Sequence, residues 1–269
     1  MLDRSQAETL LVFANTLADA AAEVTLQHFR TPIAVDNKRV GGFDPVTVAD
    51  RGAEDAIRRL IEERHPEHGI LGEEAGHRRA RSDLTWVIDP IDGTRAFITG
   101  SPLWGTLIAL NDGERAVIGV LDQPFLKERF WGVSLPTWRE AGLVSPKGRQ
   151  GLTTRACTRL EDAVLSSTTI EMFRSGERLA FEHLMARARL TRFGGDCYQY
   201  GLLAYGFMDL VVETGLAPYD IQALIPIIEG AGGAVTDWQG RAADQGGSIV
   251  AAGDPRAHAL ALEVLEGAV

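Results

Sequence analysis

Two carboxylates at the end of an apolar strand are the clearest chemical signal in this sequence of 269 residues. Residues 86–94 read WVIDPIDGT, so Asp89 and Asp92 stand three positions apart directly after apolar residues. Gly93 permits a close backbone approach, and Thr94 stands where a helix can begin and offer free N–H groups to a phosphate. Carboxylates also suit Mg²⁺, which proteins often hold together with a substrate phosphate. The segment therefore predicts a metal and phosphate site, whereas an Asp-rich turn explains only part of it.

Further acids stand at the boundaries of other expected elements. Glu73 follows the strand-like residues 69–72, Asp50 lies in the first turn of an expected helix, and Asp220 opens another. Ordinary N-capping would account for Asp50 and Asp220, and solvated surface would account for Glu73. Each signal is weak alone, but their order along one chain is informative.

Taken together, these motifs resemble the inositol monophosphatase family over nearly the whole chain. The motifs are DPVTVAD at 44–50, GEE at 72–74, DPIDGT at 89–94, YD at 219–220 and EGAGG at 229–233. The resemblance implies a layered αβαβα fold, Mg²⁺-dependent hydrolysis of phosphate monoesters, sensitivity to Li⁺ and a homodimer. Tyr219 stands where the family usually has Trp, and Gly230 interrupts the usual Glu-Ala-Gly-Gly, which indicates a subfamily.

The resemblance also implies roles for individual residues. Two or three Mg²⁺ ions would be held by four carboxylates and one carbonyl oxygen, those of Glu73, Asp89, Asp92, Asp220 and Ile91. Asp50 and Thr94, helped by Glu73, would orient and deprotonate a water that attacks phosphorus in line with the leaving alcohol. The backbone N–H groups of Gly93 and Thr94 would hold the phosphate. Lys38 and Asp44 would lie on an exposed, mobile loop over the metals.

Two later segments are similar to the histidinol-phosphatase branch of the family, namely GGDCY at 194–198 and VVETGLAPYD at 211–220. Asp196 and Glu213 would place two acids on the alcohol side of the pocket. L-Histidinol phosphate carries an amine that is cationic at neutral pH, so these acids would favour it over an uncharged polyol. Gly195 is a further candidate on the substrate side.

Several alternatives remain open for these later residues. Arg192 would contact either the substrate or a partner subunit. Asp196 could simply cap a helix, and Glu213 could be an ordinary acid at a strand end. Inositol phosphate or a broad range of monoesters is the alternative substrate. A regulatory binding protein with secondary phosphatase activity is the alternative from another class of protein.

Composition excludes other functions. The chain is 45% hydrophobic and 24% charged, with a formal net charge of −10, so we expect a globular protein that binds cations and neither nucleic acid nor membrane. It contains no Gly-Lys dipeptide, and therefore no P-loop. Pro66 breaks any helix at His65-Pro66-Glu67-His68, which disfavours a metal site there. The acidic start and the two cysteines, Cys157 and Cys197, favour a cytoplasmic protein with no signal peptide.

The elements that position these residues fall into two groups. The first group is a helix at 5–29 capped by Ser5 and Glu8, a helix at 48–64, and strands at 33–36, 69–72, 84–89, 105–110, 116–121 and 128–133. Short strands with turns between them indicate a mainly antiparallel sheet. A polar stretch at 145–149 is a candidate junction between lobes.

The second group alternates strands and helices. We expect strands at 163–166, 210–212, 234–236 and 248–251, and helices at 176–187, 197–207, 220–230 and 255–265. The fold class is thus α+β with an α/β part, arranged as an αβαβα sandwich. An N-terminal lobe at 1–147 would carry most metal ligands, and a C-terminal lobe at 148–269 would carry Asp220 and the substrate side. The active site would lie between them.

Overall fold

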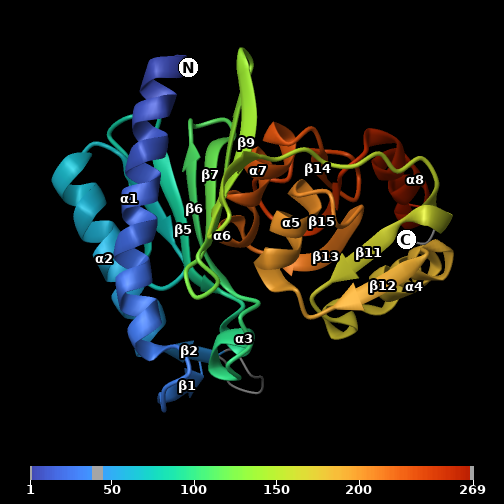
Figure 1. Ribbon diagram of the computed structural model, residues 1–269, viewed down its shortest axis with the longest axis horizontal. Helices are drawn as coiled ribbons and strands as arrows, with labels where there is room; N and C mark the ends of the chain where they lie inside the picture. Colours follow the sequence, from blue (N-terminus) through green and yellow to red (C-terminus); the bar gives the residue numbers. More distant parts are fainter. Residues whose placement is uncertain (1, 38–44, 267–269) are drawn as a thin grey trace.

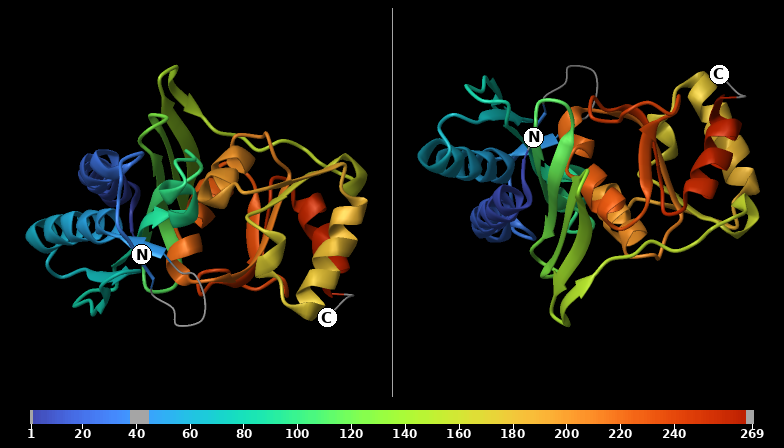
Figure 2. Two further views of the ribbon diagram at one scale, coloured as in Figure 1. Left: turned by 90° about the horizontal axis from the view of Figure 1, so that it is seen from below. Right: turned by 90° about the horizontal axis from the view of Figure 1, so that it is seen from above.

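Five layers alternate between helices and sheets across the molecule (Figure 1). We describe residues 2–37 and 45–266 of a computed structural model. Helices α1 (Arg4–His28) and α2 (Val48–Arg64) cover the outer face of a first sheet. Helices α5 (Asp196–Ala204), α6 (Pro218–Ile221) and α7 (Leu224–Gly230) separate this sheet from a second one, and α4 (Ser175–Arg187) and α8 (Pro255–Glu266) form the last layer. The expected αβαβα sandwich is confirmed (Figure 2). Lys38 and Asp44 lie outside the described residues.

Helix α1 is a core helix of this fold. Its N-cap is Asp3, whose Oδ1 accepts a hydrogen bond from the backbone N–H of Gln6 at 2.8 Å, while Gln6 Oε1 accepts from Asp3 N–H at 3.0 Å. The capping box expected at Ser5 and Glu8 is therefore wrong by two residues, because Asp3 reaches the free N–H groups first. By length and composition α1 could cross a membrane, yet 39% of its apolar window is buried inside the protein.

The first sheet contains eight strands in the order β10-β9-β8-β7-β6-β5-β3-β4. Their bounds are β3 Gly69–Gly72, β4 Gly76–Arg78, β5 Thr85–Asp92, β6 Gly105–Asn111, β7 Ala116–Gln123, β8 Glu128–Leu135, β9 Trp138–Ser145 and β10 Gly148–Gly151. All neighbours pair antiparallel except β3 and β5, which pair parallel. The mainly antiparallel sheet that the sequence predicts is thus confirmed. A separate two-stranded sheet pairs β1 (Val35–Asn37) with β2 (Pro45–Thr47).

The polar stretch at 145–149, a candidate junction between lobes, forms a hairpin. Strands β9 and β10 pair antiparallel there, with Gly148 opposite Ser145, so the first sheet continues to Gly151. Pro146 and Gly148 serve the turn of this hairpin. The division of the chain into lobes at 147 and 148 stays a prediction.

The second sheet contains five strands in the order β12-β11-β13-β15-β14. Their bounds are β11 Val164–Ser167, β12 Leu190–Phe193, β13 Leu210–Leu216, β14 Ala234–Asp237 and β15 Gly247–Ala252. Short 3₁₀ helices occupy Leu160–Asp162 and Ile170–Met172. The α6 and α7 segment was expected as one helix at 220–230. The helix is interrupted at Gln222, between α6 and α7. Pro226 has no N–H to donate to the carbonyl of Gln222, four residues earlier, so one helical hydrogen bond cannot form there.

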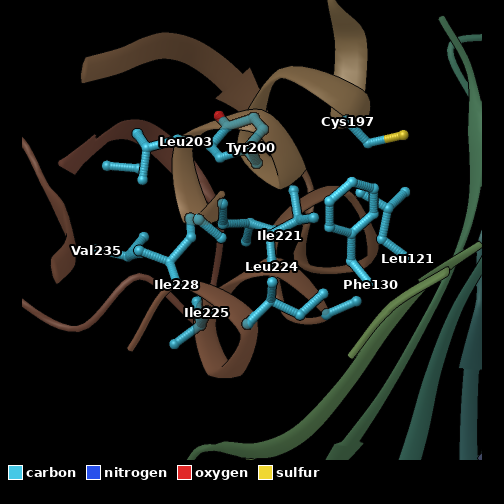
Figure 3. Close-up of a cluster of buried hydrophobic side chains, with 14 of the residues drawn as sticks. Leu121, Phe130, Cys197, Tyr200, Leu203, Ile221, Leu224, Ile225, Ile228 and Val235 are labelled. Atoms are coloured by element: carbon cyan, nitrogen blue, oxygen red, sulfur yellow. The ribbon is translucent and has the colours of Figure 1, made fainter. Parts of the chain in front are cut away.

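The middle helices are held by both sheets. Figure 3 shows side chains of α5, α6 and α7 packed together, with Leu121 and Phe130 of the first sheet reaching the same apolar cluster. A Cβ at Gly119 of β7 would lie 1.9 Å from the carbonyl oxygen of Ala223. Only glycine therefore lets the start of α7, at its N-cap Ala223, come this close to the first sheet.

Candidate active site

Three carboxylates from two elements meet between the sheets. Asp89 and Asp92 stand at the end of β5, and Asp220 lies in α6. One oxygen of each lies within 4.8 Å of one oxygen of the others. Strand β5 extends through both acids instead of ending at Asp89, and its register against β6 shifts between them. The structure thus brings together three of the four carboxylates expected as metal ligands.

Each of these acids is also fixed by a backbone N–H group. Asp89 Oδ1 accepts from Ile91 N–H at 3.0 Å, and Asp220 Oδ2 accepts from Ala217 N–H at 2.7 Å. Asp220 therefore caps α6, as the ordinary interpretation expected, and faces the acidic cluster as well. These bonds hold the carboxylates in defined orientations.

Burial and mutual repulsion raise the pKa values of the acids in this cluster. Burial and the charges of Glu73, Asp92 and Asp220 raise the pKa of Asp89 well above its usual value. Burial, with a smaller effect of the Glu73 charge, raises the pKa of Asp220 to about 7. A divalent cation would relieve this repulsion, and oxygen ligands suit Mg²⁺. The donor set therefore fits a magnesium site.

Glu73 lies in the turn after β3, beside this cluster. Its backbone N–H donates to the carbonyl of Ile88 in β5 at 3.2 Å. Its carboxylate is close enough to raise the pKa of both Asp89 and Asp220. The structure thus places the fourth expected ligand next to the other three.

Asp50 and Thr94 are also brought together. Thr94 Oγ1 lies 3.4 Å from Asp50 Oδ1 and 3.1 Å from the carbonyl oxygen of Ile91, and its hydroxyl can donate to either. Asp50 is fully buried, and its Oδ2 accepts from the backbone N–H and the hydroxyl of Thr47 at 2.8 and 2.5 Å. The N-capping role and the expected pairing with Thr94 therefore use different oxygens of one carboxylate.

Gly93 connects β5 to the short helix α3 (Thr94–Ile98) with a left-handed backbone, at a φ of 84°. A Cβ there would lie 3.1 Å from both Asp196 Cβ and the carbonyl oxygen of Leu103. Glycine is required by both the conformation and the space. The expected phosphate-binding N–H groups of Gly93 and Thr94 lie at the start of this helix.

A cavity of about 140 Å³ adjoins the cluster. Its lining contains acids and apolar groups, namely Asp92, Thr168, Met172, Asp196, Cys197, Tyr200, Glu213, Leu216 and Asp220. The expected substrate acids Asp196 and Glu213 thus share a cavity with two expected metal ligands. Such a cavity can hold a small ligand that presents positive charge.

Asp196 does not cap its helix as the ordinary interpretation expected. It is the first residue of α5, with a φ of 41°, and the N–H of Cys197 donates instead to Asp92 Oδ2 at 2.7 Å. Burial and the Glu213 charge raise the pKa of Asp196 to about 7, against an opposing effect of Arg95. The side chain is therefore available to the cavity.

Glu213 lies inside strand β13 and not at its end. Its Oε1 accepts from Thr168 N–H and Gln199 Nε2, both at 2.7 Å, and its Oε2 accepts from the Tyr200 hydroxyl at 2.8 Å. Burial nevertheless raises the pKa of Glu213. These three donors hold one carboxylate in a single orientation at the cavity wall.

Gly195 and Arg192 lie outside this lining. Gly195 is the N-cap of α5, and a Cβ there would lie 2.7 Å from Gln199 Cβ, so it serves close packing. Arg192 is exposed on the edge strand β12, where its carbonyl accepts from Ser166 Oγ at 3.2 Å. The structure does not bring either residue to the cavity wall.

Sequence reasoning missed several residues that line this cavity or hold Glu213 in its wall. Thr168, Gln199 and Tyr200 hold Glu213 in place, and Met172 and Leu216 supply apolar wall. Gln199 and Tyr200 follow Asp196 by three and four positions, so helical spacing could have found them. Thr168 carries no comparable signal because it acts through its backbone.

A second group of possible metal ligands is His65, Glu67 and His68. Trp86 Nε1 donates to His68 Nδ1 at 3.1 Å, and this places the proton of the neutral ring on Nε2. His68 Nε2 lies 3.2 Å from Glu67 Oε1 and is therefore a donor to it. This tautomer supports the prediction that the segment is not a metal site.

The five layers and the carboxylate cluster are features of a metal-dependent phosphatase. The chain belongs to the inositol monophosphatase family, whose model matches residues 6–269. It is 40% identical to the bifunctional phosphatase IMPL2, chloroplastic, of Arabidopsis thaliana, over 98% of this chain and 77% of that protein. It is 34% identical to the histidinol-phosphatase of Chlorobaculum parvum, over 86% of each. Its fold is similar to that of an inositol monophosphatase from Zymomonas mobilis, with a TM-score of 0.85, 43% identity, and coverage of 98% of this chain and 100% of that one.

Proposed function

We propose that this phosphatase hydrolyses L-histidinol phosphate to L-histidinol and phosphate, a step of histidine biosynthesis, with Mg²⁺ as cofactor. The observation that carries the proposal is the cavity shared by Asp196 and Glu213 with Asp92 and Asp220. In this cavity the acids proposed to bind the metal lie beside the acids proposed to bind a cationic alcohol. The histidinol-phosphatase of Chlorobaculum parvum, at 34% identity, supports this choice of substrate.

The residues that would hold two or three Mg²⁺ ions are Glu73, Asp89, Asp92, Asp220 and the carbonyl of Ile91. When bound, Mg²⁺ neutralises phosphate charge, lowers the pKa of a water and stabilises the leaving alkoxide. The carboxylates keep their orientation through the backbone bonds described above. The Gly93 and Thr94 N–H groups would hold the phosphate oxygens.

Asp50 and Thr94 would prepare the water. A hydroxyl has one proton to donate and two lone pairs to accept. Because Thr94 Oγ1 donates to Asp50 or to the Ile91 carbonyl, its lone pairs can accept from a water and orient it toward phosphorus. Asp50 would then receive a proton of this water through Thr94. Glu73 would help to orient and deprotonate the same water.

Asp196 and Glu213 would recognise the amine and imidazole of the substrate. Glu213 already accepts three hydrogen bonds, so it acts mainly through its charge and fixed position. Asp196 lies at the wall of the same cavity, and a cationic group there would lower its pKa by attraction. An uncharged polyol would bring no positive charge to these two acids.

Inositol 1-phosphate is the second candidate substrate. The Zymomonas mobilis structure, at 43% identity, is that of an inositol monophosphatase, and IMPL2 is named as bifunctional. Because Asp196 and Glu213 lie at the cavity wall and inositol is uncharged, we nevertheless expect any activity on inositol phosphate to be secondary. The remaining proposals are a homodimer, a cytoplasmic location and inhibition by Li⁺, which size-exclusion chromatography, fractionation and a Li⁺ titration would test.

The test is phosphate release with Mg²⁺ from L-histidinol phosphate, myo-inositol 1-phosphate, fructose 1,6-bisphosphate and adenosine 3′,5′-bisphosphate. We expect the highest kcat/KM for L-histidinol phosphate. Faster turnover of the inositol ester would overturn the specificity, and no turnover of any ester would overturn the enzyme assignment.

A charge-matched pair of variants tests the cause of the specificity. Glu213→Gln keeps the shape and can still accept from Thr168 N–H, but it removes the charge. Glu161→Gln changes net charge equally on the exposed surface. We expect the preference for L-histidinol phosphate over inositol phosphate to fall only in Glu213→Gln.

A further inference from the structure

Glu54 of helix α2 is a buried carboxylate outside the residues assigned above. Its side chain is only 1% exposed. Its Oε2 accepts from the backbone N–H of Glu74 at 2.8 Å, and its Oε1 accepts from Ala75 N–H at 3.0 Å and from Arg58 Nε at 2.7 Å. Hydrogen bonds to an ionised carboxylate are stronger than those between neutral groups. Glu54 is therefore a strong anchor for the backbone that it holds.

The backbone held by Glu54 is the turn that carries Glu73. This turn joins β3 to β4, and Arg58 Nη2 donates to the carbonyl of Gly76 at its far end. A Cβ at Gly72 would lie 2.3 Å from Glu54 Oε1, so glycine is needed for the carboxylate to reach under the turn. The turn is thus shaped around this one side chain.

The spacing of α2 connects this anchor to the catalytic pair. Asp50, Glu54 and Arg58 follow one another by four residues and lie on the same helix face. Asp50 reaches Thr94 at one end of the face, and Glu54 reaches the turn of Glu73 further along. One rigid helix therefore relates the position of Glu73 to that of Asp50 and Thr94.

We propose that Glu54 is a positioning residue, which fixes Glu73 at the metal site through the backbone of residues 74–75, and that Arg58 holds Glu54 in this role. The inference rests on the proposed function, because it takes Glu73 to be a metal ligand. A buried ion pair that served the fold alone would change stability and leave metal affinity unchanged. The two roles can therefore be separated by measuring metal binding directly.

The experiment measures binding of Mn²⁺ alone, from the electron paramagnetic resonance signal of the free ion, in the full chain and its variants. Glu54→Gln replaces an acceptor oxygen by an amide that cannot accept from both N–H groups. We expect its Kd for Mn²⁺ to rise by about 10-fold or more, as is typical when the support of a metal ligand is lost. Glu62→Gln on the exposed side of the same helix, 3.9 Å from Arg78, is the matched control and should bind as the wild type does.

A combination with Glu73→Gln shows whether Glu54 acts through Glu73. We expect the double variant to bind Mn²⁺ no more weakly than Glu73→Gln alone, because Glu54 would no longer have the Glu73 carboxylate to position. The Mg²⁺ concentration for half-maximal hydrolysis should rise in Glu54→Gln, while kcat at saturating Mg²⁺ falls much less. Additive losses in the double variant would overturn the proposal.

Folding is checked by the melting temperature in EDTA. If Glu54→Gln does not fold, Arg58→Met tests the same anchor, because it removes the guanidinium that orients the Glu54 carboxylate. Arg58→Met should weaken Mn²⁺ binding, and Arg58→Lys should restore part of it. Unchanged Mn²⁺ affinity in whichever of these variants folds would overturn the inference. If the wild-type protein binds no Mn²⁺ and releases no phosphate, the proposed function itself fails.

Discussion

The acids at the end of β5 and in the facing helices serve two purposes each. Asp50 caps α2 with one oxygen and faces Thr94 with the other, and Asp220 caps α6 while it faces the cluster. Asp92 accepts from the N–H of Cys197 at the start of α5. Because capping requires an oriented carboxylate, the helix starts hold these acids in fixed orientations.

Removal of one charge from the cluster should stop catalysis and leave the fold intact. Asp89→Asn and Asp220→Asn keep the shape of each side chain, so we expect turnover to fall by at least about 100-fold, beyond the usual cost of losing only the support of a ligand. Circular dichroism and melting in EDTA should show a folded protein, because the repulsion that raises both pKa values is reduced. Near-normal turnover in either variant would refute the site.

Variants of Asp50 and Thr47 can separate the capping role of Asp50 from its catalytic role. Thr47→Ala removes the hydroxyl that accepts from Ala49 N–H, so unfolding in urea should show a loss of about 1 kcal/mol of stability with kcat largely kept. Asp50→Asn should instead lower kcat by about 10²–10⁴-fold, the usual contribution of a general base. Equal effects of both variants on kcat would mean that Asp50 is only a cap.

At the scale of elements, the sequence predicts the parts whose signal is local. The apolar run of β5 and its two acids mark both strand and site, and the periodicity of α2 marks its length. The sequence does not predict strands β4 and β10, because they are short edge strands of the first sheet and are rich in polar residues. The orientation of Glu213 depends on Thr168 and Tyr200, which meet it only in the folded chain. Tertiary contacts of this kind leave no pattern in one sequence.

The hydrogen bond from Trp86 of β5 to His68, which lies between α2 and β3, should make stability depend on pH. Burial of His68, with the charges of His65 and Arg78, lowers its pKa, and the bond from Trp86 requires an unprotonated Nδ1. The unfolded chain, with an imidazole pKa near 6.5, then binds more protons below that pH. Stability is therefore present above about pH 6.5 and is lost as the pH falls below it.

Calorimetry at pH 8 and pH 5.5 measures this effect. We expect His68→Asn, whose amide oxygen can accept from Trp86, to lose less stability on acidification than the wild type. His258 is buried with a lowered pKa in both proteins and contributes equally. An identical fall of the melting temperature in both proteins would show that His68 is not responsible.

At the scale of the whole molecule, the net charge of −10 is unevenly distributed. The two sheets enclose a middle layer in which Asp89, Asp92, Asp196, Glu213 and Asp220 gather around one cavity and its adjoining cluster. Burial of these acids lowers the free energy of unfolding, and a bound cation would raise it again. We therefore expect metal binding to stabilise the folded protein.

Mg²⁺ should raise the melting temperature of the wild-type protein. At 100 times its Kd, a ligand of the folded state alone stabilises by about 2.7 kcal/mol. Scanning calorimetry with Mg²⁺ and with EDTA measures the difference, and Asp89→Asn should show a much smaller one. A wild-type melting temperature unaffected by Mg²⁺ would mean that the cluster does not hold the metal.

The most direct test is phosphate release from L-histidinol phosphate as Mg²⁺ is added to metal-free protein. We expect no turnover in EDTA, saturable activation by Mg²⁺, and a kcat/KM above that for myo-inositol 1-phosphate at every Mg²⁺ concentration. Turnover that is unaffected by EDTA, or no release at any Mg²⁺ concentration, would contradict the account.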